Sequence, residues 1–188
     1  ADYYNPYGHL FDFYNPGAIL NDHIGILGPS VEYDGTLYIS SEGGGLISFD
    51  LRQQTFHQYT LPQNSGNPTR SIFKTTYLDG NRILCGTSQG EVYEFNLHSH
   101  QFSLFYQTTD RRPIYHISKS HSGQFIIGSI SMAEGLAFIS NDGQRTVQTG
   151  FPVKGKGDMH FSHVICVCEA DHDVYLIGTK SDGLFCYD

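Results

Sequence analysis

The stretch Leu37-Tyr38-Ile39-Ser40-Ser41, followed after a Gly-rich turn by Leu46-Ile47-Ser48-Phe49-Asp50, sets the pattern for the whole chain. A short apolar strand, a tight turn and a second strand that closes on an aromatic and an acidic or amide residue return with variations along the sequence. The repeats lie 45, 42 and 50 residues apart, measured between the positions taken as equivalent, Tyr38, Ile83, Phe125 and Tyr175. A period of roughly 40 to 50 residues made of short strands is typical of β-propeller blades.

The composition agrees with an all-β chain. The 188 residues include 13 Tyr, 13 Phe and 21 Gly but no Trp, a balance typical of many strands joined by tight turns. A formal charge of −8 without a Lys/Arg run argues against nucleic acid or an anionic membrane as partner. The sequence has no apolar run of the roughly 18 residues that a membrane-spanning helix needs, and no signal-peptide pattern at its start; a mature or excised segment would look the same.

Each repeat divides into four strands, which the second shows best. Its strands are expected over residues 72–77, 82–86, 91–96 and 102–106, with turns at 79–81 and 88–90. We therefore predict one all-β domain over residues 1–188, a β-propeller segment of four four-stranded blade units. The units cover approximately residues 15–60, 61–106, 107–150, and 151–188 together with 1–14.

The last unit ends after its third strand, and the N-terminus offers a fourth. Tyr4-Asn5 and Phe11-Asp12-Phe13-Tyr14 repeat the spacing of Phe49-Asp50 and Phe56-His57-Gln58-Tyr59. Because pairing would cover an open strand edge, we expect the N-terminal strand to complete the last blade, within one chain or between two. Three arrangements stay open: a four-bladed ring, two chains forming a ring of eight, or an arc of a larger propeller.

The four cysteines form neither a metal-binding nor a disulfide pattern. Cys166 and Cys168 are two residues apart on one expected strand and so share a side. A bond from either to Cys186 would have to cross from the first to the third strand of a blade, about two strand spacings of ~4.8 Å. We expect all four to be buried as small apolar residues.

The repeats resemble the two-component regulator propeller repeat. The clearest copy begins at Glu32 and contains the Asp34-Gly35 hairpin, the Tyr38-Ile39-Ser40-Ser41 strand end, the Gly43-Gly44-Gly45-Leu46 turn and Phe49-Asp50. Residues 175–188 form a nearly equal copy, and the likeness extends over essentially the whole chain. The sequence departs from the family where Tyr, Ile or Phe replaces its frequent Trp and where the third unit lacks the aromatic-Asp close.

In that family such repeats build the periplasmic sensor of hybrid two-component systems, best known from Bacteroides-like gut bacteria, where they detect breakdown products of complex glycans. The resemblance implies a periplasmic sensor segment that binds an oligosaccharide and signals to a membrane-linked histidine kinase in the same protein. Any kinase activity would lie outside these residues. The resemblance also implies more blades than four, which favours the arc.

Ligands of propellers bind at the mouth of the central channel, where two sets of loops gather. Six of the eleven Lys and Arg residues map to those loops, which hints at an anionic ligand. The candidate ligand-binding residues are Arg70, Arg111, Arg112, Lys154, Lys156, His160, His23 and His163. Tyr115, Phe151 and Phe161 could stack on a sugar ring, although packing in the core is the better explanation for them. The Gly-rich residues 151–160 form the longest expected loop of this face.

No catalytic, metal or cofactor motif is present in the sequence, so we expect a binding module and not an enzyme. Two rival interpretations stay open. One is a propeller lyase or hydrolase with a channel site near His23 and His163. The other is a protein-interaction scaffold that binds or self-associates through blade edges.

Overall fold

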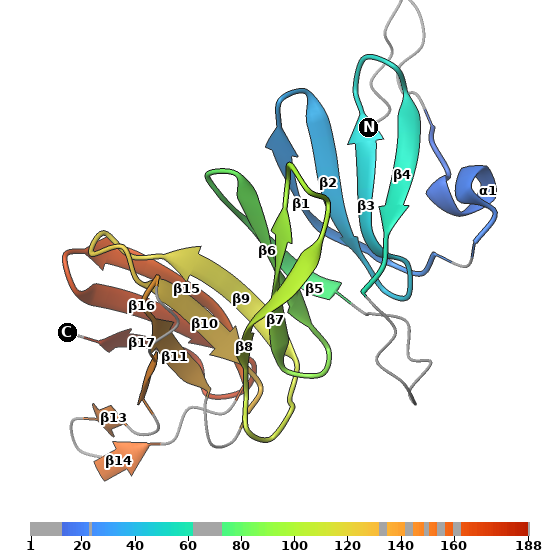
Figure 1. The fold of residues 1–188 in the computed structure, drawn as a ribbon. Helices are drawn as coiled ribbons and strands as arrows, with labels where there is room; N and C mark the ends of the chain where they lie inside the picture. Colours follow the sequence, from blue (N-terminus) through green and yellow to red (C-terminus); the bar gives the residue numbers. More distant parts are fainter. Residues whose placement is uncertain are drawn as a thin grey trace, which may run out of the picture.

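The computed structural model describes residues 13–22, 24–61, 73–131, 135–141, 145–148, 151–153, 157–159 and 163–187. The chain is all-β apart from one five-residue helix within these residues, α1 (Pro16–Leu20). Four antiparallel sheets follow one another along the chain and fan out in sequence order, so that the first and the last lie at opposite ends of the molecule (Figure 1).

The strands of each sheet are consecutive in sequence. The first sheet holds β1 (Leu27–Tyr33), β2 (Thr36–Ser41), β3 (Gly45–Asp50) and β4 (Thr55–Tyr59), and the second holds β5 (Phe73–Asp79), β6 (Arg82–Thr87), β7 (Glu91–Asn96) and β8 (Phe102–Gln107). The third sheet holds β9 (Ile114–Lys119), β10 (Phe125–Ser129), β11 (Leu136–Ile139) and β12 (Arg145–Gln148). The last sheet holds β15 (Val164–Asp171), β16 (Val174–Thr179) and β17 (Leu184–Tyr187).

These sheets confirm the all-β prediction and its antiparallel meanders. In the second sheet the expected strands and turns are all present, with ends shifted by one or two residues. Asp34 and Gly35 close the first hairpin with φ values of 48° and 74°, the left-handed pair that a two-residue hairpin turn requires. Glu32 fixes this turn by accepting a hydrogen bond from the Gly35 N–H at 2.7 Å.

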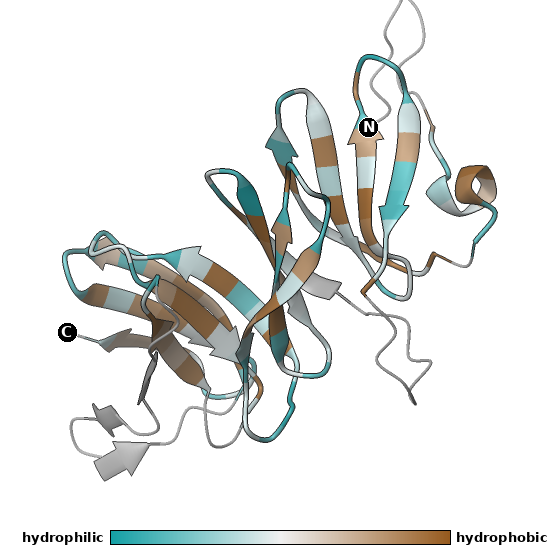
Figure 2. Cartoon of the chain, in the orientation of Figure 1, coloured by the Kyte–Doolittle hydropathy of each residue, from teal (hydrophilic) through white to brown (hydrophobic). Residues whose placement is uncertain are grey.

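Alternation along the strands gives each sheet two apolar faces. We call the side that turns toward the next sheet in sequence the forward face, and the opposite side the rear face. In the second strand of the second sheet, Leu84 points forward into the core shared with the third sheet. Ile83 and Cys85 point to the rear, into the core shared with the first. A third core joins the third and last sheets, and Figure 2 shows the apolar bands along these strands.

The register corrects the alignment of the first repeat by one residue. Tyr38 points forward and packs on Ile83, which points to the rear of its own sheet, so the two positions are not equivalent. Ser40 pairs with Leu46 in the first sheet as Gly86 pairs with Val92 in the second, so Ser40 and Gly86 are equivalent. Two residues earlier in each strand, the residue equivalent to Tyr38 is therefore Leu84. A shift of one residue moves a strand side chain to the other face, and the loose sequence pattern did not fix that choice.

Glycines let neighbouring sheets approach closely at two of these interfaces. A Cβ atom on Gly86 would lie 2.7 Å from Cγ2 of Ile114 in the third sheet. A Cβ atom on Gly128 would likewise lie 2.9 Å from Cγ1 of Val164 in the last sheet. The first strand of each following sheet thus places a branched side chain into a glycine hollow of the sheet before it.

The N-terminal segment was expected to complete the last sheet, and the structure does not confirm this closure. Residues 1–12 lie outside the described part, and Tyr14 packs on Phe49 and Phe56 of the first sheet. Helix α1 follows shortly after Tyr14. Asn15 caps it by accepting a hydrogen bond from the Ala18 N–H at 3.2 Å, and Pro16 starts its first turn.

Two further expectations need correction. Residues 151–160, expected to be a loop, contain a two-stranded hairpin of β13 (Phe151–Val153) and β14 (Gly157–Met159). Only Cys85 of the four cysteines is buried, whereas Cys166, Cys168 and Cys186 are exposed free thiols. The last three lie on the forward face of the last sheet, which no described sheet covers.

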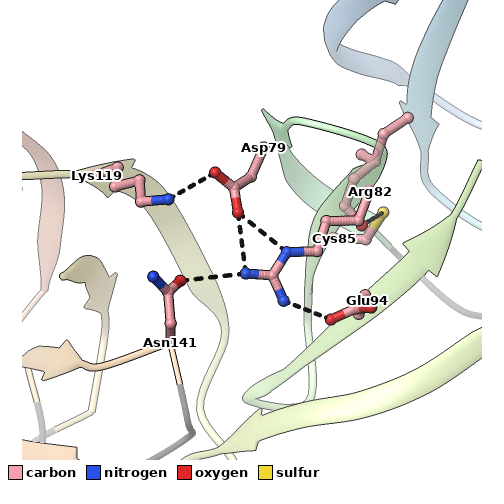
Figure 3. Close-up of polar contacts among 7 residues, drawn as sticks. Asp79, Arg82, Cys85, Glu94, Lys119 and Asn141 are labelled. Atoms are coloured by element: carbon pink, nitrogen blue, oxygen red, sulfur yellow. Dashed lines mark hydrogen bonds and ion pairs between the residues drawn. The ribbon is translucent and has the colours of Figure 1, made fainter. Parts of the chain in front are cut away.

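A polar network ties the second sheet to the third at the end where the first hairpin of each sheet turns (Figure 3). Asp79 Oδ2 accepts hydrogen bonds from Arg82 Nε and Nη2 at 3.0 and 2.9 Å, and its Oδ1 accepts one from Lys119 Nζ at 2.7 Å. Arg82 also reaches Glu94 at 2.7 Å and Asn141 at 3.3 Å. Burial raises the pKa of Asp79, but the two cations outweigh it and hold that pKa below its ordinary value.

We expect Asp79→Asn to lower the free energy of unfolding by about 1–2 kcal/mol at pH 7, because the amide cannot pair with both cations. The Asp79 carboxylate has a lowered pKa, so its contribution is present above the ordinary value of about 4 and disappears as the pH falls through the lower folded value. Urea denaturation of both proteins at pH 7 and pH 3 measures this. An equal difference at the two pH values, or an equal loss in the exposed control Asp110→Asn, would contradict the prediction.

Candidate functional site

The first strand of every sheet carries an irregularity near its start. The register is interrupted between Leu27 and Ser30 in β1, and residue 74 lacks a ladder partner between Phe73 and Thr75 in β5. Tyr115 in β9 and Ile165 in β15 are the corresponding extra residues of the third and last sheets. Such β-bulges redirect a side chain away from the sheet face, and they recur here at the same end of each sheet.

The bulges of the third and last sheets open a cavity of about 520 Å³ between them. Tyr115 and Ile165 line it, while their neighbours Ile114 and Val164 are buried in the sheet interfaces. The other lining residues are Ile130, His163, Cys166, Gly178, Thr179 and Lys180. This volume falls within the usual range of small-molecule sites, roughly 300–1,000 Å³.

Backbone hydrogen bonds fix the rim of this cavity. The Lys180 N–H donates to the carbonyl of His163 at 3.0 Å, and the Ile130 N–H donates to that of Pro113 at 3.1 Å. His163 adopts a left-handed conformation with φ of 68°, which turns the chain into β15. Thr179 Oγ1 donates to the Gly183 carbonyl and accepts from the Asp182 N–H, both at 3.0 Å, so the turn beside Lys180 is braced from within.

The lining combines a phenol, an imidazole, an ammonium group, a hydroxyl group and a thiol with two isoleucine side chains. Apolar walls with a few convergent polar groups are typical of sites that bind small organic molecules. The ammonium of Lys180 and the imidazole of His163 add donors suited to an anionic group. The described residues place no group of three His, Cys, Asp or Glu side chains that could hold a metal ion.

His116 follows Tyr115 in β9 and pairs with Gly128 of β10. Its Nε2 is 2.9 Å from Ser118 Oγ, and its Cβ faces the Gly128 backbone. Burial lowers the pKa of His116 to about 4. The ring is therefore neutral at physiological pH and adds no charge to the cavity.

A smaller cavity of about 290 Å³ lies at the opposite end of the same two sheets. It holds the contact of His121 Nδ1 with Glu169 Oε2 at 3.0 Å. Burial raises the pKa of Glu169, but hydrogen bonds from the backbone of His121 and Asp173 outweigh it and lower that pKa. The carboxylate has its partners within the chain, so we assign this cavity a structural role.

The structure brings only part of the predicted site together. His163, a candidate ligand-binding residue, lines the larger cavity together with Lys180, one of the six cations assigned to the channel-mouth loops. Tyr115, for which packing in the core was the preferred explanation, lines it too. Arg111 and Arg112 are exposed on the connection between β8 and β9 and do not line that cavity. The remaining candidates lie outside the described side chains: His23, Arg70, Lys154, Lys156 and His160.

The residues missed from the sequence are Ile130, Ile165, Cys166, Gly178 and Thr179. One signal could have revealed part of the set. Two equivalent strands begin with adjacent apolar residues, Ile114-Tyr115 and Val164-Ile165, which breaks the strict apolar/polar alternation of a strand. Such a break is the sequence pattern expected for a β-bulge. Cys166 was missed because it was assigned to a buried core.

No family model and no curated protein matches the chain in sequence. Solved structures of similar fold include the extracellular domains of two hybrid two-component systems of B. thetaiotaomicron. BT4673 is 14% identical with a TM-score of 0.67 over 86% of this chain, and BT3049 is 17% identical with 0.63 over 93%. The β-propeller domain of Myceliophteria thermophila Cps50 (Swd1) is 12% identical with 0.58 over 86%.

These likenesses show the fold. The chain has a β-propeller-like arrangement of sheets, and it covers 21% and 22% of the two B. thetaiotaomicron domains and 57% of the Swd1 domain. None of the helices in the described part of the chain has the length and apolar character needed to cross a membrane.

We expect the lowered pKa of His116 to make the protein lose stability as the pH falls. As the pH falls below the ordinary histidine pKa of about 6.5, His116 becomes protonated in the unfolded chain, whereas in the folded protein it becomes protonated only near pH 4. Relative to His116→Gln, the wild-type protein should lose about 3 kcal/mol of unfolding free energy between pH 7 and pH 4. Denaturant titrations at the two pH values test this, with His98→Gln on an exposed turn as control. A constant difference between wild type and His116→Gln would show that His116 titrates normally.

Proposed function

We propose that this chain is the ligand-binding part of an extracytoplasmic sensor, and that the cavity between the third and last sheets holds the ligand. The observation that carries the proposal is the meeting of Tyr115, His163 and Lys180 in one cavity of about 520 Å³, at the end of the sheets where the first strands are bulged. The activity proposed is binding and not catalysis.

The ligand class follows from the lining. Tyr115 offers an aromatic ring to a sugar, while His163 and Lys180 offer donors to hydroxyl, carboxylate or sulfate oxygens. An oligosaccharide, and among oligosaccharides an acidic one, fits this set. The cavity has room for a short fragment, so the proposed ligand is a breakdown product and not a polymer.

The setting of the sensor draws on the comparisons. Two of the similar folds are extracellular domains of hybrid two-component systems, although the chain spans only about a fifth of their length. On this basis we propose a periplasmic location and a histidine kinase module in the same protein, which receives the signal through rigid-body contacts.

Calorimetric titration with matched neutral and acidic oligosaccharide fragments tests the proposal. Lys180→Gln should weaken an acidic fragment by about tenfold, the loss of one charged hydrogen bond of about 1.4 kcal/mol, and should leave its neutral counterpart unchanged. Tyr115→Leu should weaken both, because stacking does not depend on charge.

Arg52→Gln is the matched control, since Arg52 is an exposed cation on the turn between β3 and β4, away from the cavity. The absence of binding by any fragment would rule out the oligosaccharide. Binding that is insensitive to both Lys180→Gln and Tyr115→Leu would move the site elsewhere on the chain.

A further inference from the structure

The larger cavity is lined by apolar side chains that the packing of the sheets does not explain. Tyr115, Ile130 and Ile165 are each half-buried and line it. Within the described part of the chain, the three apolar cores include none of them. Their neighbours Ile114 and Val164, in contrast, are 0% exposed between the sheets. The bulges thus turn Tyr115 and Ile165 out of the interface, and their apolar surface faces the cavity.

Ile130 reaches the cavity from the third sheet. Its N–H donates to the Pro113 carbonyl at 3.1 Å, which ties the residue after β10 to the start of β9, beside Tyr115. Ser129 and Ser131, on either side of Ile130, are 0% exposed and do not line the cavity. Among the described residues, the third sheet therefore presents to the cavity one aromatic ring and one aliphatic side chain.

The polar side chains of the cavity come from the last sheet and its turns. The hydroxyl group of Thr179 already donates to the Gly183 carbonyl and accepts from the Asp182 N–H, both at 3.0 Å. His163 and Lys180 are then the main donors of this side toward a ligand. The cavity is thus divided into a polar part around these two residues and an apolar part around Tyr115 and the two isoleucines.

The apolar part selects among sugars by the cost of burying a hydroxyl group. A hydroxyl group set against Ile130 or Ile165 would lose its water without gaining a hydrogen bond from either side chain. A methyl group in the same place would gain free energy by its burial. Since an ordinary hexose carries a hydroxyl group on nearly every carbon, two aliphatic side chains beside an aromatic ring favour a sugar that carries a methyl group.

We propose that the ligand of this cavity is a methyl-bearing sugar whose methyl group packs against Ile130 and Ile165, an inference that rests on the function proposed above. Tyr115 stacks on the sugar ring, while His163 and Lys180 bind its polar groups. The methyl group belongs to a 6-deoxyhexose or to an acetyl substituent, which present the same surface to the isoleucines. Ile130 and Ile165 are then the residues that set the specificity of the site.

Calorimetric titration with two matched pairs of uronic acid disaccharides tests the proposal. The members of the first pair end in L-fucose or in L-galactose, which differ only in the hydroxyl group on carbon 6. The members of the second pair differ only in an O-acetyl group. The wild-type protein should bind the methyl-bearing member of at least one pair about tenfold more tightly. The pair that shows the preference identifies the source of the methyl group.

Two double variants test whether the isoleucines cause the preference. Ile130→Thr combined with Ile165→Thr should lose most of it, whereas Ile130→Val combined with Ile165→Val should keep it. Valine and threonine have the same shape but differ in a methyl and a hydroxyl group, so lost packing would affect both variants alike. Both isoleucines lie outside the described cores, so both variants should fold, which circular dichroism checks. As a control, Lys180→Gln should weaken both members of each pair and leave their ratio unchanged.

Equal affinities within both pairs would overturn this inference, as would a preference that survives the threonine variant. In either case the sensor proposal stands, because the disaccharides would still have bound. If none of the four disaccharides binds while other acidic fragments do, the methyl-bearing sugar is again ruled out and the proposed function remains. If no oligosaccharide fragment binds at all, both proposals fail.

Discussion

The packing of one sheet face on the next builds the three apolar cores that hold this chain together. Each inner strand sends alternate side chains into two different cores, so no sheet buries its apolar surface without a neighbour. At Gly86 and Gly128 a missing side chain admits the branched residue of the following sheet, which fixes the spacing between sheets. Loss of one interface exposes apolar residues on two sheets at once.

The larger cavity is a consequence of this packing. Since the sheets meet along their first strands, a bulge near the start of each first strand must send its extra residue out of the interface. Tyr115 and Ile165 are such residues, and the carbonyl of His163 holds the Lys180 turn beside them at 3.0 Å. At the opposite end of the sheets, the Asp79 network joins the second sheet to the third.

Much of the fold could be predicted from the sequence, because side chains alternate between the two faces of a strand and this alternation is visible in the residue pattern. Strand positions, hairpin turns and the shared side of Cys166 and Cys168 follow from local pattern. Three predictions were wrong for a common reason: the alignment of Tyr38 with Ile83, the loop over residues 151–160 and the burial of Cys166, Cys168 and Cys186. Each depended on contacts with other parts of the fold, and local pattern does not contain that information.

The candidate site divides in the same way. A repeated all-β chain, and the end of the sheets at which Tyr115, His163 and Lys180 fall, follow from local sequence pattern, because strand alternation and turn residues act within a few positions. The packing of the third sheet on the last brings these three into one cavity with Cys166 and Thr179 and leaves Arg111 and Arg112 outside it. The exposure of Leu27 and Leu184 also emerges only in the folded chain, because burial is set by contacts between residues far apart in the sequence as well as by those nearby.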